Sequence, residues 1–291
     1  MKDCVIIGGG PAGLTAALYL ARFLRSVTVF DGGEARAAMI PRTHNLTAFP
    51  DGIPGQDLLD RMRSHARRYG AVITAGTVEA VERWEGAFRV RTNRHLQAAR
   101  TVIFATGVFN HRPPLSPQDH AQGLARGLIR YCPICDAYEV QDKRIAVLGR
   151  GTHGMQEASF LQHYSSSVTL ISPDGPPGAA RGGITVLEPA LRDIALSETE
   201  VLMTLQDGTT RHFDTLYVAL GTTPRTDPAG RLGVRLEEGG HIGIDANQKT
   251  SLDGIYAIGD VTNGIDQIAV AMGQGAVAAT AIHNNLTASG S

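Results

Sequence analysis

The chain has 291 residues, of which 43% are hydrophobic and 34 are glycine, a composition typical of a water-soluble α/β protein with room for two domains. The formal net charge is −1 at pH 7, so electrostatics favours neither nucleic acid nor an anionic membrane as a partner. No apolar run has the length of a membrane span, and the N-terminus lacks the apolar stretch of a signal peptide. With three cysteines and no export signal, we expect a protein of the reducing cytoplasm.

The first predicted unit is a strand, a glycine-rich turn, a helix and a second strand. Cys4–Ile7 reads as a buried strand, Leu14–Leu24 as an apolar helix, and Val27–Phe30 as a strand that ends in an acid, Asp31. The turn has the pattern G-x-G-x-x-G, in the order Gly8, Gly9, Gly10, Pro11, Ala12, Gly13. The first glycine allows a sharp bend, the second lets a diphosphate approach the backbone, and the third lets helix and strand pack closely. Helix N–H groups meet the phosphates and the acid accepts from a ribose hydroxyl, so this unit predicts dinucleotide binding.

The next stretch is loop-like and then becomes regular again. Prolines and glycines prevent a helix over 35–55, where Asn45 could face a cofactor. A surface helix is predicted over Gln56–Tyr69, with its arginines on a solvated face. Strands are predicted over 71–73, 78–81, 88–90 and 101–104, the last running into Ala105, Thr106 and Gly107. Residues 110–114 read as a linker out of this domain.

Beyond the linker lies a pair of cysteines, Cys132 and Cys135, followed at once by Asp136. Two cysteines at this spacing can close and open a small disulfide ring, and one thiol of such a pair usually has a lowered pKa. An adjacent carboxyl group can give a proton to a leaving thiolate. The alternatives are half of a zinc site, for which two further ligands are missing, and an inert pair. We expect a redox pair and no metal.

The pattern of the first unit then recurs. A strand over Lys143–Leu148 enters a second glycine turn over 149–154, followed by a helix over Met155–His163 and a strand over Val168–Ile171. Residues 216–221 repeat the pattern of an apolar strand followed by glycine, and the stretch 254–260 is followed by a predicted helix of small residues over Gln267–Leu286. The chain therefore predicts an α/β fold with two Rossmann-like three-layer domains, the second inserted in the first.

These motifs, in their order and spacing, resemble low-molecular-weight thioredoxin reductases over nearly the whole chain. The resemblance implies an FAD domain formed by residues 1–111 and 243–291, with a shortened redox and pyridine-nucleotide domain, 112–242, between them. The residues expected to hold FAD are Gly8, Gly10, Pro11, Ala12, Gly13, Asp31, Asn45, Val78, Ala105, Thr106, Gly107, Gly259, Asp260, Gln267 and Ile268. The helix that starts at Gln267 would point its positive end at the flavin ring. A homodimer is also implied.

By the same resemblance, Cys135 faces the flavin, Cys132 attacks the disulfide of the partner and Asp136 donates a proton. The chain departs from the family in its second domain. Relatives have several cations after the strand that corresponds to Val168–Ile171, and these bind the 2′-phosphate of NADPH. This chain has Asp174 and a Pro/Gly-rich link to residues 184–187, with Arg181 as the nearby cation. An aspartate repels a phosphate, so we expect NADPH and NADH to bind weakly or not at all.

The sequence therefore predicts an FAD-dependent dithiol–disulfide oxidoreductase. Its partner would be a thioredoxin-like protein or a small-molecule disulfide or dithiol, and its electron donor could be a ferredoxin-type carrier. One alternative is an oxygen-dependent dithiol oxidase that forms a disulfide in a small molecule. The other is a flavin-based redox sensor without turnover.

Overall fold

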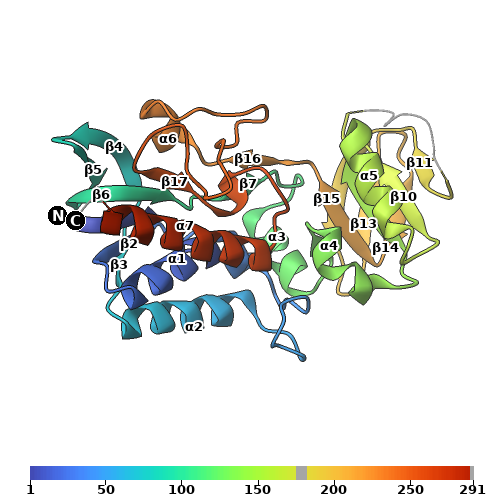
Figure 1. Ribbon diagram of the computed structural model, residues 1–291. Coiled ribbons are helices and arrows are strands. Elements are labelled where there is room, and N and C mark those ends of the chain that lie inside the picture. The colour runs from blue at the N-terminus through green and yellow to red at the C-terminus, as the bar shows by residue number, and fades with distance from the viewer. Residues whose placement is uncertain (175–181, 289–291) are drawn as a thin grey trace. The chain divides into compact units, whose positions relative to one another are not determined.

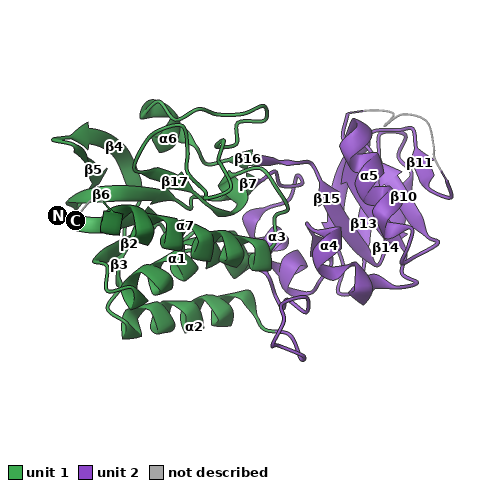
Figure 2. Cartoon of the chain, viewed as in Figure 1, with its two compact units in different colours: residues 1–39, 53–109, 223–291 green, residues 40–52, 110–222 purple. Residues whose placement is uncertain are grey.

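The computed structural model describes residues 1–174 and 182–288 (Figure 1). The chain forms two compact units, unit 1 with residues 1–39, 53–109 and 223–291, and unit 2 with residues 40–52 and 110–222 (Figure 2). Two stretches belong to other units than the domain boundaries expected from the sequence would give. Residues 223–242 join unit 1, because Ala229, Val234 and Ile242 are buried in its core. Residues 40–52 join unit 2, where the Asn45 side-chain amide donates to the carbonyl of Ile134.

Unit 1 is built on a seven-stranded sheet with the order β3-β2-β1-β6-β5-β4, and β17 pairs with β6. Strands β1 (Lys2–Ile7), β2 (Val27–Asp31), β3 (Val72–Ala75), β6 (Leu96–Phe104) and β17 (Ile255–Ala257) are parallel to their partners in this core. β4 (Val78–Trp84) and β5 (Ala87–Thr92) form an antiparallel hairpin that extends it. The buried strands are apolar on both faces, as in other parallel sheets.

Helices α1 (Pro11–Arg22), α2 (Gly55–Arg68) and α7 (Ile268–Ala288) lie on one face of this sheet (Figure 1). Cys4 and Ile6 of β1 point to these helices, whereas Val5 and Ile7 point to the opposite face, where they pack with Ala229, Val234, Ile242 and Val261. The small residues of α7 allow close packing on α1, since a Cβ atom at Gly275 would lie 2.6 Å from the carbonyl oxygen of Ala12. α6 (Asp227–Arg231) lies in the segment that covers the other face.

Unit 2 has a parallel five-stranded sheet with the order β11-β10-β9-β15-β8. Its strands are β8 (Ile129–Arg130), β9 (Ile145–Gly149), β10 (Val168–Ile171), β11 (Thr185–Leu187) and β15 (Thr215–Ala219). α5 (Gly151–Leu161) packs on one face. An antiparallel sheet of β12 (Leu191–Leu196), β13 (Val201–Leu205) and β14 (Thr210–Phe213) packs on the other. The unit therefore has three layers, and the strands of 191–213 were not predicted from the sequence.

The remaining elements are short. α3 (Pro117–Ala125) and α4 (Pro133–Asp136) belong to unit 2, and β7 (Val108–Asn110) pairs with β16 (Thr222–Pro224) where the chain passes between the units. The expected Pro/Gly-rich link after Asp174 and its cation, Arg181, lie outside the described residues. No helix within 1–174 and 182–288 is long and apolar enough to cross a membrane. The predicted α/β class with two Rossmann-like domains is confirmed by these parallel sheets.

Candidate functional site

The glycine turn of unit 1 joins the end of β1 to the start of α1. Gly8 has a φ of +119°, and a Cβ atom there would lie 2.1 Å from the carbonyl oxygen of Ala105. A Cβ atom at Gly13 would lie 2.1 Å from the carbonyl oxygen of Gly8. Gly10 differs, because its Cβ atom would meet only the Cβ of Ala35, at 4.0 Å. The outer glycines therefore serve packing, whereas the space in front of Gly10 is open to a ligand.

At the start of α1, no side chain of the described residues accepts a capping hydrogen bond from the first turn. Gly10 occupies the N-cap position, Pro11 has no N–H group to satisfy, and the amide of Leu14 already donates to Gly10. The N–H groups of Ala12 and Gly13 have no partner within the helix, and they carry the positive end of its dipole. This donor set fits the diphosphate of a dinucleotide such as FAD.

Asp31 ends β2 beside this turn. A Cβ atom at Gly9 would lie 2.2 Å from the Asp31 carboxyl carbon, so the carboxylate lies directly against the glycines. It accepts from the Gly33 amide at 2.9 Å and pairs with Arg63 of α2 at 3.1 Å. The prediction that the arginines of this helix form a solvated face is wrong for Arg63, whose side chain is only 18% exposed. The Arg63 guanidinium instead points to the carboxylate of Asp31 and donates to it.

The other predicted FAD residues of unit 1 follow the parallel strands. Ala105 donates to the carbonyl of Ile7 at 2.8 Å, and the Thr106 hydroxyl donates to the carbonyl of Arg225 at 2.7 Å. Gly107 has a φ of +66°. Val78 is buried at the start of β4. The carboxyl ends of β1, β2 and β6 are therefore linked by hydrogen bonds at one edge of the sheet, where ligands of such folds bind.

Residues 259–268 carry a charged cluster that the sequence did not predict. Gly259 has a φ of +74° and donates to the side chain of Gln274 at 2.6 Å. Asp260 and Asp266 share one guanidinium, that of Arg36, at 3.1 Å and 2.7 Å. Burial raises the pKa of Asp266, the neighbouring Asp260 adds to this rise, and Arg36 opposes it.

Gln267 and Ile268 lie at the start of α7, where Gln267 accepts from the amide of Ala271 at 2.9 Å. Asn45 belongs to unit 2, whereas the other predicted FAD residues belong to unit 1. Its side chain accepts from the Thr43 hydroxyl at 3.0 Å. Unit 1 thus brings together every predicted FAD residue except Asn45.

The cysteines of unit 2 form a disulfide, Cys132–Cys135, at the start of α4. The amide of Cys135 donates to the carbonyl of Cys132 at 2.9 Å, which closes the turn between them. Pro133 is buried and Ile134 is 55% exposed. Cys4, in contrast, is fully buried in unit 1, and burial raises the pKa of its thiol to about 12. Thiol chemistry is therefore confined to the pair.

Asp136 follows the pair and is held by two donors. Arg130 of β8 donates to one carboxylate oxygen at 2.7 Å, and the Tyr217 hydroxyl of β15 donates to the other at 2.8 Å. Burial raises the pKa of Asp136, and this effect outweighs the lowering by the Arg130 charge and the Tyr217 hydrogen bond. Burial and the nearby carboxylate raise the pKa of Tyr217 well above its usual range. Neither donor was predicted from the sequence, although an arginine directly after the apolar Leu128 and Ile129 is an unusual residue for a buried strand.

The second glycine turn, between β9 and α5, is explained largely by packing. A Cβ atom at Gly149 would lie 2.6 Å from the Cα of Gly154, so these two glycines let strand and helix approach. Gly151 has a φ of +50° and open space around it. Arg150 pairs with Asp174, which follows β10. The cation nearest to Asp174 in the described chain is therefore already neutralised.

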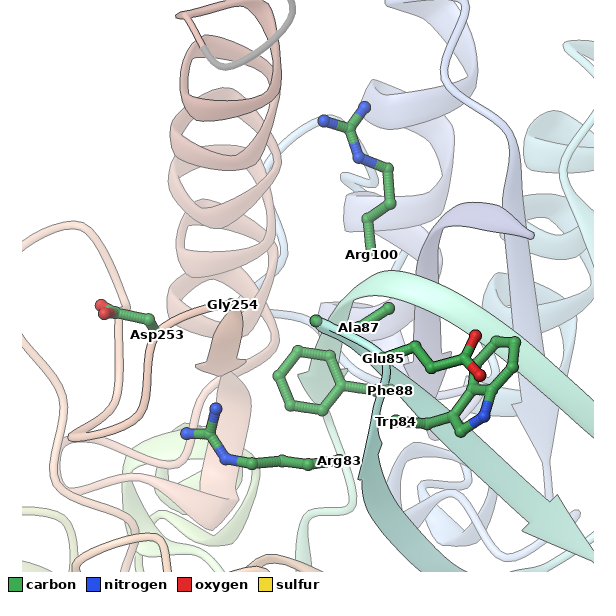
Figure 3. Close-up of a pocket in the computed structure, with 9 residues that line it drawn as sticks. Arg83, Trp84, Glu85, Ala87, Phe88, Arg100, Asp253 and Gly254 are labelled. Carbon is green, nitrogen blue, oxygen red and sulfur yellow. The ribbon is translucent and has the colours of Figure 1, made fainter.

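Figure 3 shows a pocket of about 390 Å³ at the tip of the β4–β5 hairpin, lined by residues that include Arg83, Phe88, Arg100 and Asp253. The Arg83 guanidinium lies over the Phe88 ring, 6.0 Å from its centre. None of the predicted site residues lines this pocket. Within residues 1–174 and 182–288, no group of three or more His, Cys, Asp or Glu residues is placed to hold a metal ion.

The chain is similar in sequence and in structure to known proteins. A family model described as pyridine nucleotide-disulphide oxidoreductase matches residues 2–175 and 179–275. A thioredoxin reductase of Streptomyces coelicolor is 32% identical over 288 residues, or 90% of this chain and 87% of that protein. A Clostridium pasteurianum protein described as a 34.2 kDa protein in a rubredoxin operon is 28% identical over 297 residues, or 95% of this chain and 94% of that protein. The crystal structure of thioredoxin reductase from Streptococcus pyogenes has a TM-score of 0.90 at 27% identity and covers 99% of both chains.

The family model spans most of the chain, and the relatives match it nearly from end to end. These matches confirm the resemblance inferred from the motifs, the fold class and the expectation of an enzyme. The chain belongs to the pyridine nucleotide-disulphide oxidoreductase family and is a thioredoxin reductase-like FAD disulfide oxidoreductase, an enzyme that acts on a sulfur group.

Proposed function

We propose that this enzyme passes electrons between FAD, the Cys132–Cys135 pair and a disulfide on a thioredoxin-like protein or a small molecule. The observation that carries the proposal is the closed disulfide at the start of α4, directly followed by a half-buried carboxyl group that two donors hold. FAD, when bound, accepts or supplies an electron pair. The residues proposed to hold it are those of the first glycine turn with Asp31, Asn45, Val78, Ala105–Gly107, Gly259, Asp260, Gln267 and Ile268.

In the reductive direction the Cys132–Cys135 bond is first broken by an electron pair, which leaves two sulfurs at the thiol or thiolate level. The Cys132 thiolate attacks the substrate disulfide, so that a mixed disulfide forms and one substrate sulfur leaves with the bonding pair. Asp136 gives that sulfur a proton. The Cys135 thiol then loses its proton and attacks the sulfur of Cys132, which restores the intramolecular disulfide, and the second substrate sulfur leaves with the bonding pair and takes up that proton. The substrate disulfide has gained two electrons and two protons, and the cysteine pair is oxidised again.

We propose that pyridine nucleotides serve this enzyme weakly or not at all. The family usually uses NADPH, but binding of its 2′-phosphate requires uncompensated cations, and Arg150 is paired with Asp174. One relative is described by its place in a rubredoxin operon, which supports an electron-carrier protein of the ferredoxin type as the donor. We also propose a homodimer, which the mass measured by light scattering on a size-exclusion column would test.

The electron donor can be tested on the oxidised holoenzyme without oxygen. NADPH, NADH and reduced ferredoxin are each mixed with it, and the flavin absorbance is followed. We expect rapid bleaching with ferredoxin and slow or no bleaching with either nucleotide. Fast bleaching by NADPH would contradict the proposal on the donor but not the one on the cysteine pair. Cys135→Ser is the matched variant for the next step, since it should bleach but fail to reduce a disulfide.

A second candidate function is a dithiol oxidase that hands electrons to oxygen. The Arg150–Asp174 pair favours it as well, because such an enzyme needs no pyridine nucleotide. Rapid oxygen uptake with a small dithiol, lost in Cys135→Ser, would select this function. Inactivity with every donor and acceptor would leave a flavin-based redox sensor.

A further inference from the structure

Three side chains from separate elements of unit 2 meet at the residue after the redox pair. Asp136 ends α4, Arg130 lies in β8 and Tyr217 lies in β15. Arg130 takes one oxygen of the carboxylate and Tyr217 the other, at 2.7 Å and 2.8 Å. The side chain of Arg130 is 16% exposed and Tyr217 is fully buried. The carboxyl group that is proposed to move the thiol proton is therefore fixed on two sides by donors.

The arrangement is not that of an ion pair optimised for stability. The Nε atom of Arg130 is buried and has no hydrogen-bond partner among the described residues. An arginine that only joined β8 to α4 would be expected to satisfy its buried donors, since each unsatisfied one is costly. Here the guanidinium of Arg130 donates to Asp136 through a single nitrogen. What Arg130 supplies to the site is therefore mainly a positive charge beside the carboxylate of Asp136.

That charge acts on a group whose environment otherwise favours the neutral form. Burial raises the pKa of Asp136, and Glu139 raises it slightly further, while Arg130 and Tyr217 lower it. The titratable side chains of α5, which packs against α4, are His153 and Glu157, and they pair with each other at 3.3 Å. Arg130 is thus the main charge that opposes the effect of burial on Asp136.

We propose that Arg130 and Tyr217 are positioning residues that orient Asp136 toward the cysteine pair, and that Arg130 sets the pH at which Asp136 exchanges a proton with a thiol. In one direction the departing sulfur takes the proton of the Asp136 carboxyl group and leaves a carboxylate beside Arg130. In the other direction the carboxylate removes the proton of an attacking thiol, which then breaks the disulfide. This inference rests on the proposed function of the cysteine pair.

The test measures how fast dithiothreitol reduces Cys132–Cys135 in the holoenzyme, in acid quench and alkylation experiments from about pH 5 to about pH 9. The dithiothreitol is in large excess, and each rate is divided by its thiolate concentration, so that the remaining pH dependence belongs to the protein. Arg130→Gln should move the pH midpoint of this dependence upward by about one unit or more, because an adjacent cation lowers a carboxyl pKa by about 1–3 units. Tyr217→Phe should move it upward by less. Arg130→Lys should restore most of the wild-type midpoint.

The decisive comparison is made in proteins that carry Asp136→Asn. This variant alone should show no pH midpoint, and the double variants that combine it with Arg130→Gln or Tyr217→Phe should have the same pH profile as Asp136→Asn alone. If either change shifts the profile equally with and without Asp136, or if Arg130→Gln leaves the wild-type midpoint in place, the inference is wrong. Circular dichroism and flavin content report whether each variant folds, and Tyr217→Phe together with Arg130→Lys carries the test if Arg130→Gln does not fold. A wild-type disulfide that dithiothreitol never reduces would instead overturn the proposed function itself.

Discussion

The carboxylate of Asp174 is paired with the guanidinium of Arg150 beyond the carboxyl ends of β10 and β9. In a Rossmann-like unit the 2′-phosphate or the ribose of a pyridine nucleotide would meet this edge of the sheet. Hydrogen bonding from Arg150 lowers the pKa of Asp174, so this acid is ionised at neutral pH. Among the described residues, this edge therefore presents an ion pair in which the charge of Arg150 is neutralised by Asp174.

Asp174→Asn should release Arg150 and remove the charge that repels a phosphate. We expect NADPH to bind about fivefold more tightly, a size typical of exposed charge interactions, with no comparable gain for NADH. Nucleotide titration followed by calorimetry measures both affinities. Asp193→Asn, on an exposed position of β12, is the control and should change neither. Equal gains for both nucleotides would show that the 2′-phosphate is not what Asp174 opposes.

The three cysteines should separate into two classes by their reaction with iodoacetamide. In the reduced native protein we expect Cys132 and Cys135 to be labelled, and Cys4 to react at least about a thousandfold more slowly, since its raised pKa and burial remove the thiolate. Peptide mass mapping after timed quenching gives the rates. Denaturation should abolish the difference, and Cys4→Ala should leave the labelling of the pair unchanged. Fast native labelling of Cys4 would contradict the burial seen in β1.

Gly10→Ala and Gly13→Ala should separate ligand approach from packing. Gly13→Ala places a Cβ atom against the carbonyl of Gly8, so we expect a loss of about 2–3 kcal/mol in the free energy of unfolding. Gly10→Ala has room in the protein and should cost at most about 1 kcal/mol, the effect of alanine at an N-cap. It should nevertheless weaken FAD binding about tenfold or more, because its methyl group stands where the diphosphate approaches. Urea unfolding of the apoprotein and FAD titration measure the two effects, and unchanged FAD affinity in Gly10→Ala would rule out this approach.

Arg36→Gln should destabilise unit 1 in a way that depends on pH. Because the folded pKa of Asp266 is raised, the stability linked to its protonation is present below the unfolded pKa and is lost as the pH rises through the folded value. Removing Arg36 raises that folded pKa further and leaves Asp260 and Asp266 without their shared cation. We expect a loss of about 1–2 kcal/mol at about pH 8 and a smaller loss at about pH 4.5.

Urea unfolding of both proteins at the two pH values measures this loss. Arg91→Gln is the control, since Arg91 pairs with Glu79 on the surface, where their side chains are 51% and 46% exposed. It should change the free energy of unfolding by less than about 1 kcal/mol at either pH. A pH-independent effect of Arg36→Gln would mean that Asp266 does not titrate in response to Arg36.

A motif could be predicted from the sequence wherever its structure depends mainly on residues that are neighbours in the chain. The turn of Gly8, Gly10 and Gly13 needs glycines for local geometry and for one neighbouring strand, and the order of strand, turn, helix and acid is enough to identify it. The cysteine pair is similar, because a spacing of three residues already permits the disulfide. The strand and helix periods of β1, α1, β9 and α5 also follow from local apolar patterns.

Pairs between distant residues could not be predicted in this way. Arg36 and Asp260 are 224 residues apart, and Asp136 and Tyr217 are 81 apart. A surface helix pattern does not show that Arg63 turns inward to Asp31. The three short antiparallel strands of 191–213 have too little sequence pattern to distinguish them from loops.

By itself, the sequence determined the fold class, the glycine turn between β1 and α1 and the cysteine pair that closes as a disulfide, because each is encoded within a few neighbouring residues. Only the tertiary structure decided which charges meet: Arg130 and Tyr217 at Asp136, Arg36 at Asp260 and Asp266, and Arg150 at Asp174. The reason is physical. The proton affinity of a carboxyl group depends on burial and on charges a few ångströms away, and these distances exist only after the strands and helices have packed.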